Sequence, residues 1–190
     1  MRNRIEEILL ESIQVKEELL RINVSRIKDI ADLMIECLKK NGKVLLFGNG
    51  GSASDSQHIA AEFVGRFKKD RSALAAIALT TNTSVLTSLA NDYGYEVVFA
   101  KQIEALGQKN DIAVGISTSG KAKNVALGIK QAKKMGIKTV ALTGGDGGEL
   151  AKLADTSLVV PSSVTARIQE AHITIGHIIC ELVEQALCQG

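Results

Sequence analysis

The chain has 190 residues, a length that predicts one domain around one hydrophobic core. Its 23 lysines and arginines nearly balance its 21 aspartates and glutamates, so its charge gives no reason to expect binding to nucleic acid or to an anionic membrane. The three cysteines lack metal-type spacing, which indicates reduced, buried thiols in a cytoplasmic protein.

Two amphipathic helices are predicted at the start of the chain. The first residues are charged and run into a helical pattern rather than into an apolar signal segment, and no apolar run reaches the ~20 residues that a bilayer requires. Apolar residues recur at helical spacing over 5–20 and 27–38. The first helix is apolar over much of its circumference, so residues 1–40 are expected to contact other subunits.

Five short apolar runs follow and predict five strands. They lie at residues 43–47, 75–79, 112–116, 139–142 and 157–160, and helical patterns separate them. This alternation predicts an α/β core over residues 43–190, with a mostly parallel five-stranded sheet and helices on both faces. Parallel strands bring their carboxyl-terminal loops to one edge, where a ligand is expected to bind.

The first strand leads into a loop that is rich in glycine and serine, residues 48–55, before a helix expected to begin near Ala53. Glycines let the backbone approach a ligand, the helix start attracts an anion, and Ser52 and Ser54 add hydroxyl donors. An ordinary turn with serine caps would have the same sequence. A dinucleotide site is disfavoured because no acidic residue ends the second strand.

The third strand leads into a second loop with the same chemistry. Ser117, Thr118 and Ser119 are three consecutive hydroxyl residues closed by Gly120, and they can surround phosphate oxygens with side-chain and backbone donors. Two such loops at one sheet edge predict a site for a small phosphorylated ligand. The glycine-rich run at 144–148 is equally well explained as a turn before a helix, and we expect it to be structural.

Candidate proton carriers lie on two helices. His58 and Glu62 are four residues apart on one face of the helix after the first loop, a spacing that a solvated pair would share.

The last helix is predicted to begin after Pro161, with Ser162, Ser163 or Thr165 as its cap. It is largely apolar, so its polar residues Gln169 and His177 need partners, and His177 is the better site candidate. His172, on the same helix, is expected to be a buried structural residue.

Several segments together resemble the phosphoheptose isomerase family of SIS-domain proteins. They are residues 48–67, 90–94, 117–120 and 167–172, and the similarity extends over essentially the whole chain. The resemblance implies a single SIS domain over residues 1–190 and a homotetramer whose sites are shared between subunits. It also implies conversion of sedoheptulose 7-phosphate to D-glycero-D-manno-heptose 7-phosphate, the first step toward ADP-heptose or GDP-heptose for lipopolysaccharide.

The resemblance also implies roles for individual residues. Substrate contacts would come from Asn49, Gly50, Gly51, Ser52, Glu62, Asn91, Asp92, Ser117, Thr118, Ser119 and Gln169. Glu62 and His177 would be the acid-base pair, and zinc, one ion per subunit, would be held by His58, Glu62, Gln169 and His177. Two residues depart from the family pattern: Ala122 replaces a serine and Ala166 an aspartate found in many relatives, which removes one expected hydroxyl near the phosphate.

The residue types suit this chemistry. Moving a carbonyl between adjacent sugar carbons needs a base that removes a proton and returns it to the neighbouring carbon, and one carboxylate can do both. The alternative is a regulatory SIS protein that binds a phosphosugar or a replication initiator without catalysis. Relatives of that kind lack the glutamate matching Glu62, so its presence favours an enzyme. The phosphate loops do not identify the sugar.

Overall fold

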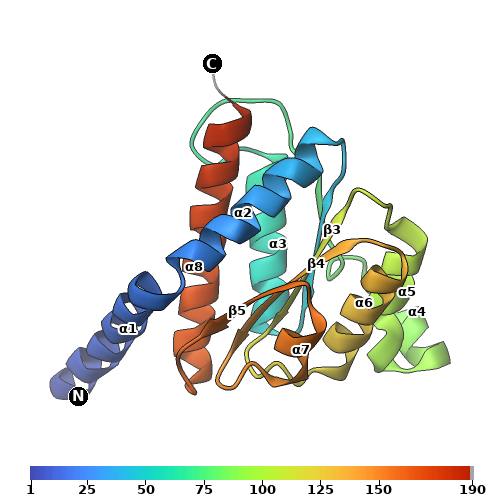
Figure 1. The fold of residues 1–190 in the computed structure, drawn as a ribbon. Helices are drawn as coiled ribbons and strands as arrows, with labels where there is room; N and C mark the ends of the chain where they lie inside the picture. Colours follow the sequence, from blue (N-terminus) through green and yellow to red (C-terminus); the bar gives the residue numbers. More distant parts are fainter. Residues whose placement is uncertain (189–190) are drawn as a thin grey trace.

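The computed structural model describes residues 1–188 and contains one five-stranded sheet with helices on both faces (Figure 1). In chain order the elements are α1 (Arg2–Ile22), α2 (Val24–Lys39), β1 (Val44–Gly48), α3 (Gly51–Val64), β2 (Ala76–Ala78), α4 (Thr83–Tyr93), the short 3-10 helix η1 (Tyr95–Val97), α5 (Val98–Leu106), β3 (Ile112–Ser117), α6 (Lys123–Lys134), β4 (Lys138–Gly144), α7 (Gly148–Leu153), β5 (Thr156–Val160) and α8 (Thr165–Leu187).

All strand pairings are parallel, in the spatial order β2-β1-β3-β4-β5. Every residue of β1 and of β3 is buried, as expected for strands covered on both faces. The predicted α/β fold and its five strands are therefore confirmed.

Alternate residues of the strands face two separate apolar cores. Leu46 and Val114 belong to the core beneath α2, α3 and α8, whereas Leu45 and Ala113 belong to the core beneath α5, α6 and α7. Figure 1 shows these two helix layers on opposite sides of the sheet.

Helix α1 extends away from the rest of the chain (Figure 1). Val15 and Leu19 are its buried residues, while six of its large apolar side chains are each at least half exposed: Ile5, Leu9, Leu10, Ile13, Leu20 and Ile22. Within residues 1–188, no helix combines the length and apolar character that crossing a bilayer requires.

The starts of α3 and α8 differ from the sequence prediction. Helix α3 begins at Gly51 rather than near Ala53, since Gly50 adopts a φ of +54° that turns the chain directly into the helix. Helix α8 begins at Thr165 with Val164 as its N-cap.

None of the three hydroxyl residues predicted to cap α8 does so. The Ser162 hydroxyl instead accepts a hydrogen bond from the Val164 backbone N–H (3.1 Å), which stabilises the turn before the helix.

The predicted buried residues of α8 are confirmed. His172 is 0% exposed, and Cys180 is buried. The His172 Nε2 lies 3.0 Å from the Thr143 carbonyl oxygen, which can only accept, so Nε2 carries the proton. Cys37 is also buried, whereas Cys188 is partly exposed.

Acidification is expected to destabilise the fold through His172. Burial lowers the pKa of its imidazole from 6.5 to about 4, although the hydrogen bond to Thr143 opposes this. The unfolded chain takes up the proton near pH 6.5 and the folded chain only near pH 4, so stability present at pH 7 is lost across this window, by about 3 kcal/mol. Urea unfolding at several pH values measures it.

The matched variant is His172→Gln, whose side-chain amide can donate to the same carbonyl but does not titrate. Its free energy of unfolding should change less between pH 7 and pH 4 than that of the wild type. Equal pH dependence of the two proteins would contradict the prediction.

Candidate functional site

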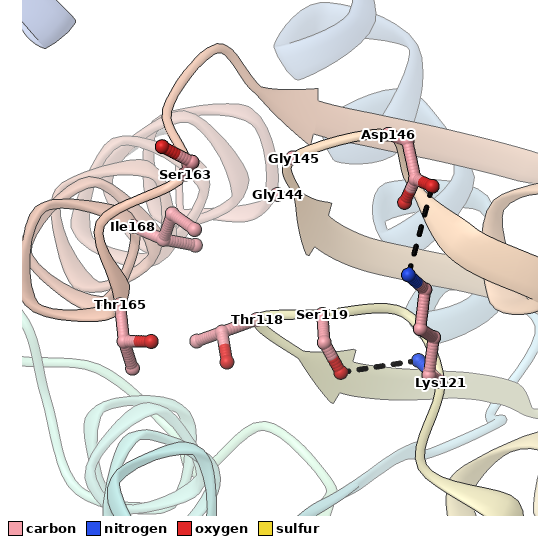
Figure 2. Close-up of a pocket in the computed structure, with 9 residues that line it drawn as sticks. All are labelled: Thr118, Ser119, Lys121, Gly144, Gly145, Asp146, Ser163, Thr165 and Ile168. Carbon is pink, nitrogen blue, oxygen red and sulfur yellow. Dashed lines mark hydrogen bonds and ion pairs between the residues drawn. The ribbon is translucent and has the colours of Figure 1, made fainter.

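A cavity of about 290 Å³ opens at the carboxyl ends of β3 and β4, next to the start of α8. Its lining residues are Thr118, Ser119, Lys121, Gly144, Gly145, Asp146, Ser163, Thr165 and Ile168. Figure 2 shows hydroxyl side chains from two separate segments around it, with Lys121 reaching toward Asp146. Hydroxyl groups and one ammonium group at a strand-end loop are suited to holding a phosphate.

Close backbone contact fixes the shape of this cavity. Gly120 has a φ of +62°, and a Cβ there would lie 2.0 Å from the carbonyl oxygen of Gly147. The Gly120 carbonyl also accepts a hydrogen bond from the Leu150 N–H (3.0 Å). The glycine-rich run at 144–148 forms the turn before α7, as predicted, and packs against the second hydroxyl-rich loop. Its first three residues also line the cavity, which the sequence prediction missed.

A pair of amides joins the two predicted phosphate loops. Asn49, at the end of β1, donates to the side-chain oxygen of Asn124 (2.9 Å) and accepts from the amide of Asn124 (2.8 Å). Asn124 lies in the first turn of α6 and is 5% exposed. The loop that carries Asn49, Gly50, Gly51 and Ser52 is therefore held at a fixed distance from the Ser117–Ser119 loop.

Three of the predicted acid-base and metal residues lie together between α3 and α8. The His58 Nε2 is 3.0 Å from the His177 Nε2 and 3.2 Å from a carboxylate oxygen of Glu62. Gly176 permits this approach of the two helices, because a Cβ there would lie 2.5 Å from the Cδ1 of Ile59. The Glu62 side chain is 24% exposed, so a ligand can reach it.

This group has the donors and the spacing of a metal site. One ligand atom from each of His58, Glu62 and His177 lies within 4.8 Å of the others. Tetrahedral zinc, with bonds of about 2.0–2.1 Å, separates its ligand atoms by roughly 3.3 Å, close to the two distances above. Two imidazoles and one carboxylate leave a coordination position open, as catalytic zinc sites do.

Gln169 contacts the first glycine-rich loop. Its amide packs over Gly51, where a Cβ would come within 2.3 Å of the Gln169 Nε2. The structure thus brings Gln169 to the first phosphate loop, while His177 lies two turns further along α8.

Asn91 and Asp92 are not brought into the cavity within one chain. Both are exposed at the end of α4, and the Asn91 amide donates to the Asp92 carboxylate (2.8 Å). Neither side chain is among those lining the cavity.

Asp55 is a half-buried acid that sequence analysis missed. One of its carboxylate oxygens is buried and has no hydrogen-bond partner among the described residues. Burial raises the pKa of Asp55 to about 6, although nearby His58 lowers it. Asp55 ends the segment rich in glycine and serine and lies one helical turn before His58, and this position could have identified it as a candidate site residue.

Lys121, Ser163 and Thr165 were also missed as cavity residues. Lys121 directly follows the Ser-Thr-Ser-Gly run, which could have identified it. The other two lie at the start of α8, far away in sequence, and were considered only as helix caps.

Comparison with known proteins agrees with this geometry. A family model for the SIS domain matches residues 10–144. A phosphoheptose isomerase of Aquifex aeolicus is 52% identical over 189 residues, which cover 100% of this chain and 99% of the relative. One of Clostridium acetobutylicum is 52% identical over 98% of this chain and 96% of its own length.

Solved structures give the same result. The phosphoheptose isomerase of Neisseria gonorrhoeae superposes with a TM-score of 0.92 at 45% identity, over 97% of this chain and 98% of its own. That of Francisella tularensis has a TM-score of 0.93 at 38% identity, over 96% and 97% of the two chains.

Proposed function

Because the chain belongs to the phosphoheptose isomerase family of SIS-domain proteins, we propose that it interconverts sedoheptulose 7-phosphate and D-glycero-D-manno-heptose 7-phosphate in the cytoplasm. One observation carries the assignment to catalysis: Glu62 contacts His58, and both lie close to His177. A protein that only binds phosphosugars needs no such group.

The phosphate end of the substrate binds in the cavity of Figure 2. The hydroxyl groups of Thr118 and Ser119 donate hydrogen bonds to the phosphate there, and Lys121 supplies a positive charge. Lys121 and Asp146 are 3.7 Å apart and both largely exposed, so their ion pair is weak and Lys121 can exchange it for a phosphate dianion. This charge offsets the missing hydroxyl at Ala122.

At the other end of the substrate, the Glu62 carboxylate removes a proton from C1 of the ketose, giving an enediol. It then returns the proton to C2, which yields the aldose. His177 moves the second proton between the oxygens on C2 and C1, since an imidazole ring has one nitrogen that can donate and one that can accept. Gln169 and Asn49 position the intervening hydroxyl groups.

Zinc fits the group formed by His58, Glu62 and His177, with Gln169 as a fourth ligand from the same or a neighbouring subunit. A bound zinc ion would polarise the sugar carbonyl. A glutamate that coordinates zinc is a poorer proton carrier, so Glu62 is expected to exchange between the two roles.

The site is shared between subunits of a homotetramer. At about 1.5 Å of rise per residue, Glu62 lies roughly 16 Å along α3 from Gly51. An extended heptose phosphate spans only roughly 10 Å from phosphorus to its reacting carbons, at about 1.2 Å per bond. We therefore assign the phosphate loops and the Glu62 group of one active site to different subunits. The exposed apolar face of α1 would be covered in the contacts between these subunits.

A turnover assay on several ketose phosphates, with and without a chelator, tests this function. Sedoheptulose 7-phosphate should be converted fastest, and loss of activity in the chelator that zinc restores would support the metal. An inactive protein that binds a phosphosugar or a replication protein would instead support a regulatory function.

A further inference from the structure

A buried carboxylate holds the loop that follows α3. Glu184, on α8, is 2% exposed and accepts hydrogen bonds from the backbone N–H groups of Phe67 (3.0 Å), Lys68 (2.9 Å) and Lys69 (2.8 Å). Burial raises the pKa of Glu184, but these amides and Arg71 outweigh it and hold the pKa below its usual range. The carboxylate is therefore charged and fully engaged.

Arg71 completes this arrangement from the loop itself. Its Nε donates to Glu184 (3.0 Å), and its side chain is 4% exposed. Its terminal nitrogens donate to the carbonyl oxygens of Glu62 (2.8 Å) and Phe63 (2.9 Å) in the last turn of α3. These carbonyls have no partner within the helix, and a cation at a helix end is favoured electrostatically.

Both contacts lead to the acid-base group. Arg71 binds the backbone of Glu62 itself, and the Glu184 carboxylate binds the backbone of Phe67, whose ring centre lies 5.6 Å from that of His177. Arg71 and Glu184 thus link the end of α3 to α8 next to the two residues whose relative position matters for proton transfer.

We propose that Arg71 and Glu184 are positioning residues for the isomerisation, which hold Glu62 and the Phe67–His177 contact in the geometry that proton transfer needs. They touch neither the phosphate loops nor the cavity beside them. The measurement of kcat rests on the proposed function, but the NMR signals of the His177 ring test the positioning without it.

The test measures kcat and KM of Glu184→Gln and Arg71→Lys. Misplacing a proton carrier by a fraction of an ångström lowers kcat, and loss of a supporting contact typically costs about 10- to 100-fold. KM for the phosphosugar should stay within about threefold, because the phosphate loops are untouched. In addition, the NMR signals of the His177 ring should shift as its contact with Phe67 changes.

Asp111→Asn is the matched control. Asp111 is 3% exposed and its carboxylate also binds a cation and two backbone amides, those of Lys43 and Gln108, at the amino ends of β1 and β3. It should lose stability in the same way and keep its kcat and its His177 signals.

Unchanged kcat and unchanged His177 signals in folded Glu184→Gln would overturn the proposal, as would an equal loss of kcat in Asp111→Asn. Should Glu184→Gln fail to fold, Phe67→Leu tests the same path, because it keeps the ion pair and the backbone hydrogen bonds. A fall of about 10-fold in its kcat supports the proposal, and an unchanged kcat overturns it. An inactive wild type would refute the proposed function, while the His177 signals would still test the positioning.

Discussion

Glu62→Gln is expected to lower kcat by about 1000-fold and to leave the Kd for the phosphosugar within about threefold. The amide has nearly the shape of the carboxylate but cannot accept the proton from C1. The loops that we propose bind the phosphate lie elsewhere in the chain and should provide most of the binding. Turnover and isothermal titration calorimetry with the same protein sample measure both quantities.

Glu181→Gln is the control for this variant. Glu181 also lies on the α3–α8 side of the molecule, but its carboxylate pairs with Lys68 at 2.7 Å near the surface. Its loss should leave kcat unchanged, because exposed ion pairs contribute little. Zinc content of both variants should be measured, so that loss of metal is separated from loss of the base. Wild-type turnover in Glu62→Gln would remove Glu62 from its role.

Two inactive variants are expected to restore activity when they assemble together. Glu62→Gln removes the base, and Ser119→Asp places a negative charge where the phosphate binds. If each site takes its Glu62 from one subunit and its Ser119 from another, each of the two is intact in about half of the sites after random assembly. Both are then intact in about one quarter of the sites, which gives about one quarter of wild-type turnover. Co-expression with two tags, purification through both, and an activity assay measure this.

The control mixes Glu62→Gln with His177→Ala. Glu62 and His177 of one chain belong to the same group, so every site in this mixture has one of the two defects. It should stay inactive. No recovery in the first mixture would show that each site lies within one chain and would contradict the sharing of sites.

Much of the fold was predictable because the strands are buried on both faces. The run Val44–Gly48 is apolar without alternation, and its helix-flanked neighbours repeat the pattern, so the parallel sheet follows. The start of α8 was not predictable in the same way, since hydroxyl residues stand at several adjacent positions and each is a plausible cap. Which one binds the backbone depends on how the preceding turn meets β4, a tertiary contact.

The acid-base group was predictable in part. The spacing of His58 and Glu62 already placed them on one helix face. That His177 joins them depends on Gly176 and Ile59, which let two helices distant in the sequence approach. No local pattern encodes that contact. For the same reason the links of Arg71 and Glu184 were not foreseen, because a buried charge is recognised only once its partners are known.

The amide pair of Asn49 and Asn124 has a practical consequence for ligand measurements. Both side chains are uncharged, so dissolved salt does not screen their contact and no acid or alkali within the working range breaks it. The spacing of the two loops should stay constant as ionic strength varies. A salt dependence of phosphosugar affinity can then be attributed to attraction between ligand and ammonium charge, without invoking a change in loop shape.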